Sequence, residues 1–330
     1  MIILGIETSC DDTSCGIIRR EDEEIEVLSN VTHTQLIHAE YGGVVPELAA
    51  RAHVKNILPV LQKALEEAKI DLSEIDGIGV TYGPGLIGSL LCGVEFAKAL
   101  SYALKKSLCG VNHLEAHIYS LFLENKINFP FICLIVSGGH TDLLIFYEHF
   151  NYKLLGTTVD DAAGEALDKV GRLLGLEYPG GPAIDRISKK GNPKRIDFPR
   201  MNVKGLDFSF SGIKTSALYY IKRIGKWREI PLYPVEDIAA SFQEAVVDSL
   251  IMRIMEAVEL TGVKRVGVCG GVARNSRLRE KLREMDIEVF YPSGKFCTDN
   301  GAMVALCASY YIERGIISDI NLTSNPSLHL

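Results

Sequence analysis

The sequence predicts an α/β protein built from two domains of related topology. Its 330 residues suit two domains of about 150 residues each. Short apolar runs alternate with longer amphipathic ones, which is typical of strands alternating with helices. The layout also repeats, since residues 131–146 copy residues 2–18 and residues 266–282 copy residues 77–100. We therefore expect one domain over residues 1–129 and a second over residues 130–330, with a ligand cleft between them.

The first half of the chain is expected to hold a hairpin followed by alternating helices and strands. Residues 2–7 and 15–18 are apolar strands, and the small polar residues between them form a turn that presents hydroxyl and N–H groups. Pro46 stands at the first position of a long helix, in which Pro59 predicts a kink or a break. The other expected elements are strands at 25–31, 75–80 and 108–112, a helix at 87–104 and a helix that begins at His113.

The second half is expected to follow the same plan with insertions. Residues 131–136 and 142–146 form a second hairpin, and residues 266–269 form a strand that enters a glycine turn and a helix. Between these copies, residues 160–175 and the glycine-rich stretch at 178–185 introduce two helices. Residues 234–262 are expected to form one long helix with Glu236 in its first turn, where an acidic residue is favourable.

Composition and charge limit the classes of function. The 35 basic and 42 acidic residues give a net charge of −7, which argues against a chain that binds nucleic acid by bulk charge. A local basic strip at 186–204 could be a solvated loop or could touch a phosphate backbone, and the two are about equally supported. The first residues lack the basic region of a signal peptide and no apolar run approaches the length of a membrane span, so we expect a cytoplasmic protein.

The cysteines also indicate a cytoplasmic protein. Eight are scattered along the chain without a CxxC pair, and several lie in apolar runs that read as strands. This pattern favours buried, reduced thiols over a disulfide framework or a zinc knuckle.

Two histidines four residues apart, His113 and His117, lie on one face of the helix expected to begin there. With roughly 5–6 Å between their Cβ atoms, both rings can reach one divalent metal. In an isolated pair of this kind, one packed and one solvated histidine is the commoner arrangement. Asp299 offers a third ligand, and a metal held by two histidines and one carboxylate keeps positions open for water or substrate. We therefore predict a site for iron or zinc at His113, His117 and Asp299.

Glycine-rich turns predict a second, nucleotide-binding site. Phosphates need many N–H donors in a small volume, and glycine lets the backbone approach them closely. Residues 137–139 (SGG) and 270–271 (GG) offer such turns, the latter before a helix. A purine fits between two such turns, with Asp168 or Asp185 on the ribose hydroxyls. A single Gly-Gly pair usually marks only a turn, but four in one chain favour a ligand cleft.

A zinc peptidase is a weaker interpretation of the histidine pair. That chemistry needs the sequence His-Glu-x-x-His, in which the glutamate after the first histidine acts as general base. Here Glu115 stands two residues after His113, about 200° round a helix from it, and is expected to point away from the metal as a solvated or structural acid. The chain also lacks a Gly-x-Ser-x-Gly elbow and a Walker-type phosphate loop.

Eight stretches, spread nearly from end to end, together resemble the TsaD family of bacterial tRNA N6-adenosine threonylcarbamoyltransferases, formerly named glycoproteases (O-sialoglycoprotein endopeptidases). The stretches are residues 5–13 (GIETSCDDT), 41–49 (YGGVVPELA), 113–117 (HLEAH), 136–141 (VSGGHT), 160–169 (DDAAGEALDK), 179–182 (PGGP), 208–212 (FSFSG) and 297–303 (CTDNGAM). The resemblance implies the duplicated actin/Hsp70/sugar-kinase-like (ASKHA) fold. It also implies transfer of a threonylcarbamoyl group from threonylcarbamoyl-AMP to N6 of the adenosine 3′ to the tRNA anticodon.

The resemblance further implies roles for single residues. His113, His117 and Asp299 would hold the metal, and Asp11, Ser137 and His140 are the candidates for catalysis. The residues expected to contact the acyl-adenylate or its AMP part are Ile135, Val136, Ser137, Gly138, Gly139, Asp168, Gly181, Asp185 and Asn275.

Partners also follow from the family. Members work on tRNAs that decode ANN codons, with a TsaB paralogue, a TsaE ATPase and a TsaC-type enzyme that supplies the adenylate. The amphipathic segment 46–65 could be a partner face or could simply pack inside the chain. Three alternatives differ in class: an ATP-dependent small-molecule kinase or ATPase of the same fold, a metallopeptidase and a non-catalytic scaffold paralogue. Neither the kinase nor the scaffold would need the two histidines and Asp299.

Overall fold

The computed structural model describes residues 1–226 and 234–330, which form two compact units. Unit 1 comprises Met1–Asn125 together with Pro292–Leu330, and unit 2 comprises Lys126–Tyr291. This division differs from the single boundary expected at residue 129. The reason is that the C-terminal segment returns to the first sheet, where α10 (Gly301–Glu313) packs against β1 (Ile2–Glu7).

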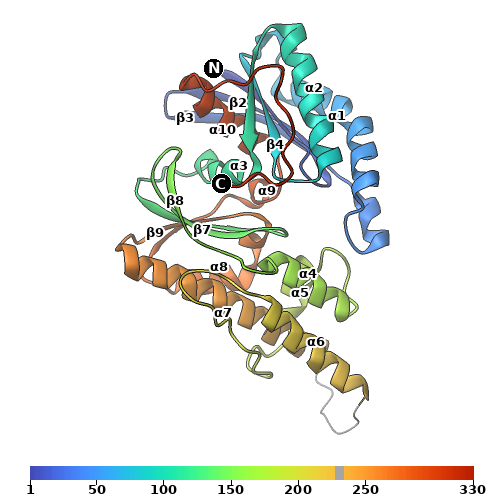
Figure 1. The fold of residues 1–330 in the computed structure, drawn as a ribbon, viewed down its shortest axis with the longest axis vertical. Helices are drawn as coiled ribbons and strands as arrows, with labels where there is room; N and C mark the ends of the chain where they lie inside the picture. The colour runs from blue at the N-terminus through green and yellow to red at the C-terminus, as the bar shows by residue number, and fades with distance from the viewer. Residues whose placement is uncertain (227–233) are drawn as a thin grey trace. The chain divides into compact units, whose positions relative to one another are not determined.

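Unit 1 is built on a five-stranded sheet with the order β3-β2-β1-β4-β5 (Figure 1). β1 runs antiparallel to β2 (Asp12–Glu21) and parallel to β4 (Gly77–Gly83), so the expected N-terminal hairpin is confirmed. The outer strands are β3 (Glu24–Thr34) and β5 (Ser107–Asn112).

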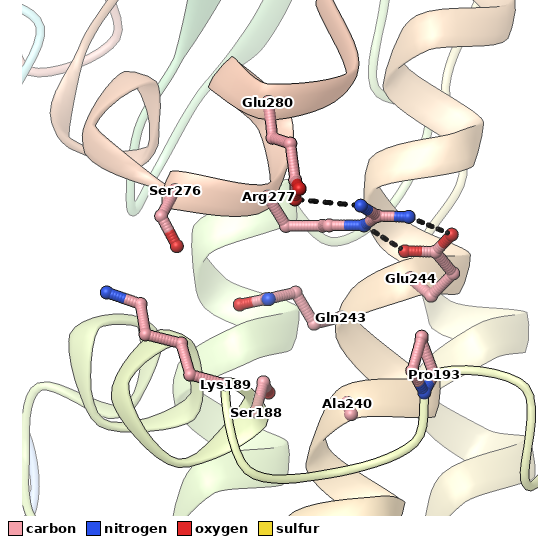
Figure 2. Close-up of a pocket in the computed structure, with 9 residues that line it drawn as sticks. All are labelled: Ser188, Lys189, Pro193, Ala240, Gln243, Glu244, Ser276, Arg277 and Glu280. Atoms are coloured by element: carbon pink, nitrogen blue, oxygen red, sulfur yellow. Dashed lines mark hydrogen bonds and ion pairs between the residues drawn. The ribbon is translucent and has the colours of Figure 1, made fainter.

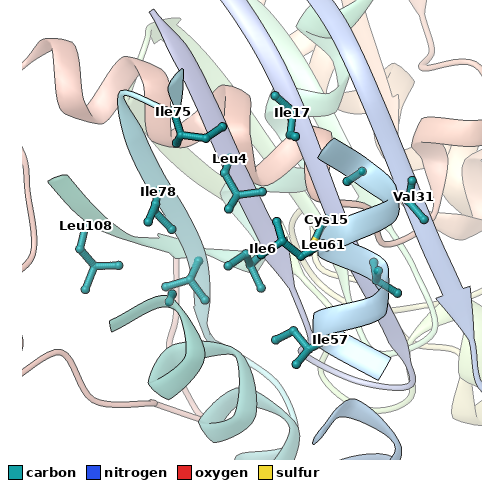
Figure 3. Close-up of a cluster of buried hydrophobic side chains, with 14 of the residues drawn as sticks. Leu4, Ile6, Cys15, Ile17, Val31, Ile57, Leu61, Ile75, Ile78 and Leu108 are labelled. Atoms are coloured by element: carbon teal, nitrogen blue, oxygen red, sulfur yellow. The ribbon is translucent and has the colours of Figure 1, made fainter. Parts of the chain in front are cut away.

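Helices cover both faces of this sheet. Leu4 and Ile6 of β1 point into an apolar cluster with residues of α1 (Pro46–Ala68) and α2 (Ile87–Leu104), which Figure 3 shows. Successive side chains of a strand point to opposite faces, so Gly5 faces the other side, where α10 lies. A Cβ at Gly5 would stand 2.1 Å from the carbonyl oxygen of Gly301, and only glycine permits this approach. The sheet therefore holds the start of α10 against its centre.

The long first helix is not broken at Pro59, contrary to one of the two outcomes expected there. α1 runs as one helix through this residue. Pro59 lies on the exposed side of the helix, where the carbonyl group that loses its partner can bond to water. The remaining helices of unit 1 are short: α3 (His113–Tyr119), α9 (Gly294–Cys297) and the 3-10 turns Leu36–Tyr41, Leu72–Glu74 and Ser120–Leu123.

Unit 2 repeats the topology of unit 1. Its sheet has the order β10-β9-β6-β7-β8, in which β6 (Phe131–Val136) runs antiparallel to β7 (Thr141–Glu148) and parallel to β9 (Arg265–Cys269). The outer strands are β8 (Asn151–Thr157) and β10 (Glu288–Phe290). With β6 in the place of β1, the two strand orders are the same, so the layout repeat seen in the sequence is confirmed.

The helices of unit 2 match the expected insertions. They are α4 (Ala163–Leu173), α5 (Gly180–Ser188), α6 (Ser211–Lys226), α7 (Val235–Thr261) and α8 (Ser276–Arg283), and a 3-10 turn spans Gly271–Arg274. α7 begins and ends within one residue of its expected limits, and most of its residues are buried. α4 packs on α5, and α5 packs on α7.

Among the described residues, one helix, α2, is long and apolar enough to cross a membrane. The sequence predicted no membrane-spanning segment here. In the structure α2 buries Leu90, Val94 and Ala97 against the sheet and also packs on α1. The rest of the helix is more exposed, and 28% of its residues are buried. All eight cysteines are free thiols, six of them buried, as expected.

Candidate metal and nucleotide sites

The two predicted metal-ligating histidines stand one turn apart on α3. Asn112 caps this helix, because its side-chain oxygen accepts the N–H of Leu114 at 2.8 Å. The cap fixes the start of the helix at His113 and so directs His113 and His117 to one side, with 4.6 Å between their ring centroids.

Asp299 reaches the same place from the far end of the chain. It directly precedes Asn300, whose side-chain oxygen caps α10 by accepting the N–H of Met303 at 2.9 Å. Asp299 Oδ1 lies 3.1 Å from His117 Nε2 and 3.6 Å from His113 Nε2. One ligand atom from each of the three residues falls within 4.8 Å of the others. All three belong to unit 1, whereas the boundary expected at residue 129 placed Asp299 in the second domain.

The cluster fits a divalent metal. His117 is 1% exposed, and within the described chain neither of its ring nitrogens has a hydrogen-bond partner, although Nε2 is close to Asp299. A buried polar atom without a partner is unfavourable, and a metal would satisfy it. Two imidazoles and one carboxylate are ligands that suit zinc and non-haem iron, and three ligands leave positions open.

Charges around His113 bear on how a metal would bind. Burial acts to lower the pKa of the His113 imidazole, but the carboxylates of Glu7 and Asp299 outweigh it and raise that pKa to about 9. Burial acts to raise the pKa of Glu7, yet the facing His113 leaves it below its ordinary value. A ligand histidine must lose its proton, so a metal at this site competes with protons at neutral pH.

Asp11 lies in the turn between β1 and β2, in the same unit as the cluster. Burial raises the pKa of its carboxyl, and the charge of Asp299 acts in the same direction. Burial and the same charge also raise the pKa of the neighbouring Asp12, to about 7. The turn predicted to serve catalysis therefore lies within the electrostatic reach of Asp299.

The turn that follows β6 in unit 2 has the form expected of a phosphate-binding loop. Ser137 N–H donates to the carbonyl of His140 at 2.9 Å, and His140 N–H donates to Ser137 Oγ at 3.1 Å. Gly138 and Gly139 are exposed between them, and a Cβ at either would meet open space. Ile135 and Val136 are fully buried in β6, so their side chains serve the core and only their backbone could face a ligand.

Other predicted nucleotide contacts are joined to this turn by α4 and α5. The Gly164 N–H at the start of α4 donates to the carbonyl of Ser137 at 3.2 Å. One turn further, Asp168 Oδ1 accepts the N–H of Gly181 at 2.9 Å, which places the carboxylate at the start of α5. Burial raises the pKa of Asp168.

Asp185 and Asn275 are the two remaining side chains among the predicted nucleotide contacts. Asp185 Oδ1 accepts from Ser276 Oγ at 2.8 Å and from Ser276 N–H at 3.1 Å, at the start of α8. Asn275 caps the same helix through the N–H of Leu278, and its Nδ2 donates to Gln243 Oε1 at 2.9 Å. The glycine turn before it closes against β6, since a Cβ at Gly270 would stand 2.5 Å from the carbonyl oxygen of Val136.

A pocket of about 190 Å³ adjoins Asn275 and Ser276 between α5, α7 and α8. Figure 2 shows Gln243 within its lining and Arg277 held between Glu244 and Glu280, at 2.7 and 2.8 Å. Its lining residues are Ser188, Lys189, Pro193, Ala240, Gln243, Glu244, Ser276, Arg277 and Glu280. Gln243 and Glu244 were not among the predicted site residues, because they lie inside a long helix and give no turn signal.

Two groups of charged residues were not among the predicted site residues. Glu115 is the structural acid of the two alternatives expected, since it is 7% exposed and accepts a hydrogen bond from the hydroxyl of Tyr311. The basic strip at 186–204 is less positive than its sequence suggests. Three of its arginines form ion pairs with acids that lie outside the strip. The pairs are Arg186 with Glu177 at 2.6 Å, Arg195 with Asp237 at 3.5 Å and Arg200 with Asp248 at 2.5 Å.

Comparison with known proteins decides the family. The sequence model of the TsaD family, described as tRNA N6-adenosine threonylcarbamoyltransferase, matches residues 26–306. The chain belongs to this family. Relatives described by the same name include that of Thermodesulfovibrio yellowstonii, 50% identical over 337 residues that span 100% of both chains. That of Dictyoglomus turgidum is 50% identical over 339 residues, which cover 100% of this chain and 99% of the relative.

Solved structures show the TsaD chain to have the ASKHA fold. HypF of T. kodakarensis superposes with a TM-score of 0.65 at 17% identity, over 95% of this chain and 48% of that one. The activator of the 2-hydroxyisocaproyl-CoA dehydratase of Clostridium difficile superposes with a TM-score of 0.53 at 16% identity, over 98% and 100% of the two chains. The expected duplicated fold is confirmed.

Proposed function

We propose how this member of the tRNA N6-adenosine threonylcarbamoyltransferases divides its reaction between its two units. The observation that carries the proposal is the convergence of His113, His117 and Asp299 within 4.8 Å, in a chain whose family match is almost end to end. We assign these three residues to a divalent metal, iron or zinc. When bound, the metal supplies Lewis-acid polarisation of the threonylcarbamoyl group.

Unit 2 is assigned to the AMP part of the donor, threonylcarbamoyl-AMP. The backbone N–H groups of residues 137–139 would bind the phosphate, as exposed glycine turns do. Asp168 and Asp185 would accept from the ribose hydroxyls, and Gly181 allows the backbone at the start of α5 to approach the ligand. The pocket beside Asn275 would take the adenine, whose polar edge Gln243 and Ser276 can meet.

The transfer itself is a substitution at the carbamoyl carbon. The N6 amine of the tRNA adenosine forms the new C–N bond, the C–O bond to phosphate breaks, and AMP leaves with the electron pair. One proton must leave the amine. Asp11, whose pKa burial raises, is the candidate to accept it, and the turn at 137–140, with Ser137 and His140, would stabilise the charge that develops on the leaving phosphate.

Partners and compartment follow the family expectation. We propose that a TsaB paralogue, a TsaE ATPase and a TsaC-type adenylate supplier act with this chain on tRNAs that decode ANN codons, in the cytoplasm. Helices α1 and α2 pack on each other, and both carry exposed apolar side chains. On α1, Val54 is 69% exposed and Leu58 52%; on α2, Ile87 is 50% exposed and Leu91 44%. Of the two alternatives expected for segment 46–65, this apolar face favours a protein partner over packing inside the chain.

The proposal is tested by removing both histidines. In a reconstituted reaction with its partners, His113→Ala combined with His117→Ala should bind no divalent metal and form no threonylcarbamoyladenosine. A matched control, Glu115→Gln, changes the acid between the two histidines and should retain the metal. Full activity of the double variant would contradict the assignment.

A further inference from the structure

Glu7 is a buried carboxylate to which the family comparison gives no role. It ends β1, is 0% exposed, and both of its oxygens accept hydrogen bonds. Oε1 accepts the N–H of Ser9 at 2.6 Å, and Oε2 accepts the hydroxyl of Thr81 at 2.6 Å. Oε2 also lies 2.9 Å from Nδ1 of His113, a residue 106 positions further along the chain. A buried carboxylate is tolerated only where such partners surround it.

The contact with Glu7 fixes which nitrogen of His113 carries a proton. An ionised carboxylate can only accept, so the neutral imidazole must carry its hydrogen on Nδ1 to bond to it. The lone pair is then on Nε2, which is the nitrogen that faces Asp299. Ser9 Oγ lies 3.2 Å from the same Nδ1 and can act as a second acceptor.

We propose that Glu7 is a positioning residue that holds His113 ready to bind the metal, with Thr81 fixing Glu7 in turn. The inference rests on the metal site proposed above. Glu7 would keep the Nδ1–H tautomer and aim Nε2 at the ion, as carboxylates behind ligand histidines do in other metal sites. It would also balance charge, because Glu7 and Asp299 together carry two negative charges against a divalent cation in a buried site.

Glu7→Gln is a sharp test, because the glutamine side chain has the shape of glutamate but only one acceptor oxygen. If that oxygen takes the Ser9 N–H, the amide NH₂ faces His113 Nδ1 and drives the ring proton to Nε2, where it blocks the metal. If the oxygen faces His113 instead, the NH₂ opposes the Ser9 N–H. Either orientation should weaken metal binding.

The experiment measures zinc affinity of the full-length chain by competition with a chelator. We expect Glu7→Gln to raise the zinc Kd by roughly 10–100-fold. Thr81→Val, which leaves the carboxylate in place, should raise it by less. The control Glu115→Gln alters another buried carboxylate, on the helix that carries both histidines, and should leave the zinc Kd unchanged. Thermal unfolding without metal, measured on each variant, separates lost affinity from lost folding.

A second measurement needs no variant. In the zinc-loaded wild-type protein, histidine-selective nitrogen NMR should show His113 protonated at Nδ1 and metal-bound at Nε2. Zinc bound through Nδ1, or equal zinc affinity of wild type and Glu7→Gln, would overturn the role of Glu7 alone. A wild-type chain that binds no divalent metal would overturn the metal site and this inference together.

Discussion

The carboxylate of Asp160 holds the start of α6. Its oxygens accept the hydroxyls of Ser209 and Ser211 at 2.5 and 2.6 Å and the N–H groups of Phe210 and Ser211 at 2.8 and 3.2 Å. Burial acts to raise the pKa of Asp160, but these hydrogen bonds outweigh it and lower that pKa below its ordinary 3.8. A group whose pKa is lowered on folding stabilises the fold above its unfolded pKa and loses that effect as the pH falls through the folded pKa.

We predict that Asp160→Ala lowers the free energy of unfolding by roughly 1–2 kcal/mol at pH 7, because several donors at a helix start lose their acceptor. The difference from wild type should shrink at a pH well below 3.8, because the stability that the charged carboxyl supplies is lost as the pH falls through its lowered folded pKa. Urea unfolding at both pH values measures it. Asp197→Ala, at a fully exposed aspartate of the same unit, should match wild type. An equal loss at both pH values would show that the charge of Asp160 is not the cause.

Among the elements, α10 links the fold to the metal site. Its first residues lie on glycines of the sheet, and Asp299 stands two residues before its start. Gly301 N–H donates to Ser14 Oγ at 2.9 Å, and Ala302 N–H donates to Asn30 Oδ1 at 3.0 Å. The position of the carboxylate ligand is therefore set by how closely the helix approaches β2.

We predict that Gly16→Ala destabilises unit 1 and weakens zinc binding. The new Cβ would stand 2.1 Å from the backbone nitrogen of Ala302, so α10 must move away, at a cost of roughly 1–3 kcal/mol or more. Thermal unfolding and zinc titration measure the two effects. Gly43→Ala, where a Cβ meets nothing within 4 Å, is the matched control and should change neither. Unchanged zinc affinity in Gly16→Ala would separate Asp299 from the packing of α10.

At the scale of the whole molecule, the two candidate sites lie in different units. The candidate metal ligands all lie in unit 1, and every predicted nucleotide contact from Ile135 to Asn275 lies in unit 2. Both units share one strand order, so the same sheet edge carries a turn after β1 in one copy and after β6 in the other. Each unit therefore has a turn at the same place in its sheet, and only unit 1 has the pair His113 and His117.

This separation predicts that zinc binding and AMP binding can each be lost without the other. His113→Ala should abolish zinc binding and leave the affinity for AMP within about twofold, because the two proposed sites are built from different residues in different units. Asp168→Ala should weaken AMP binding by tenfold or more, about 1.4 kcal/mol, and leave zinc stoichiometry unchanged. Isothermal titration of each variant with each ligand measures all four values. Loss of both ligands in either variant would contradict the separation.

The fold was predictable where the signal is local. Apolar runs and turn residues predict β1, β2, α2, α3 and α7 within a few residues, and the repeated layout predicts the shared strand order. The return of residues 292–330 to unit 1 was not predictable, because the packing of α10 on Gly5 and Gly16 links positions almost 300 residues apart.

The candidate site shows the same limit. His113 and His117 were found by their spacing, because a helix converts spacing into a shared face. Glu7 was not, since its bond to His113 depends on how β1 and α3 meet. Gln243 was missed for a similar reason: it lies inside α7 and becomes a pocket residue only where α8 packs beside it. Two of the ion pairs that make the basic strip less positive likewise join residues distant in sequence.

We propose that threonylcarbamoyl transfer by this chain depends on a metal at His113, His117 and Asp299. The most direct measurement incubates the purified protein with synthetic threonylcarbamoyl-AMP, the proposed partners and unmodified tRNA, followed by mass spectrometry of the nucleosides. We predict threonylcarbamoyladenosine with the wild type and none with Asp299→Ala. No product with any divalent metal, together with ATP consumed on a small alcohol, would contradict the claim and indicate a kinase.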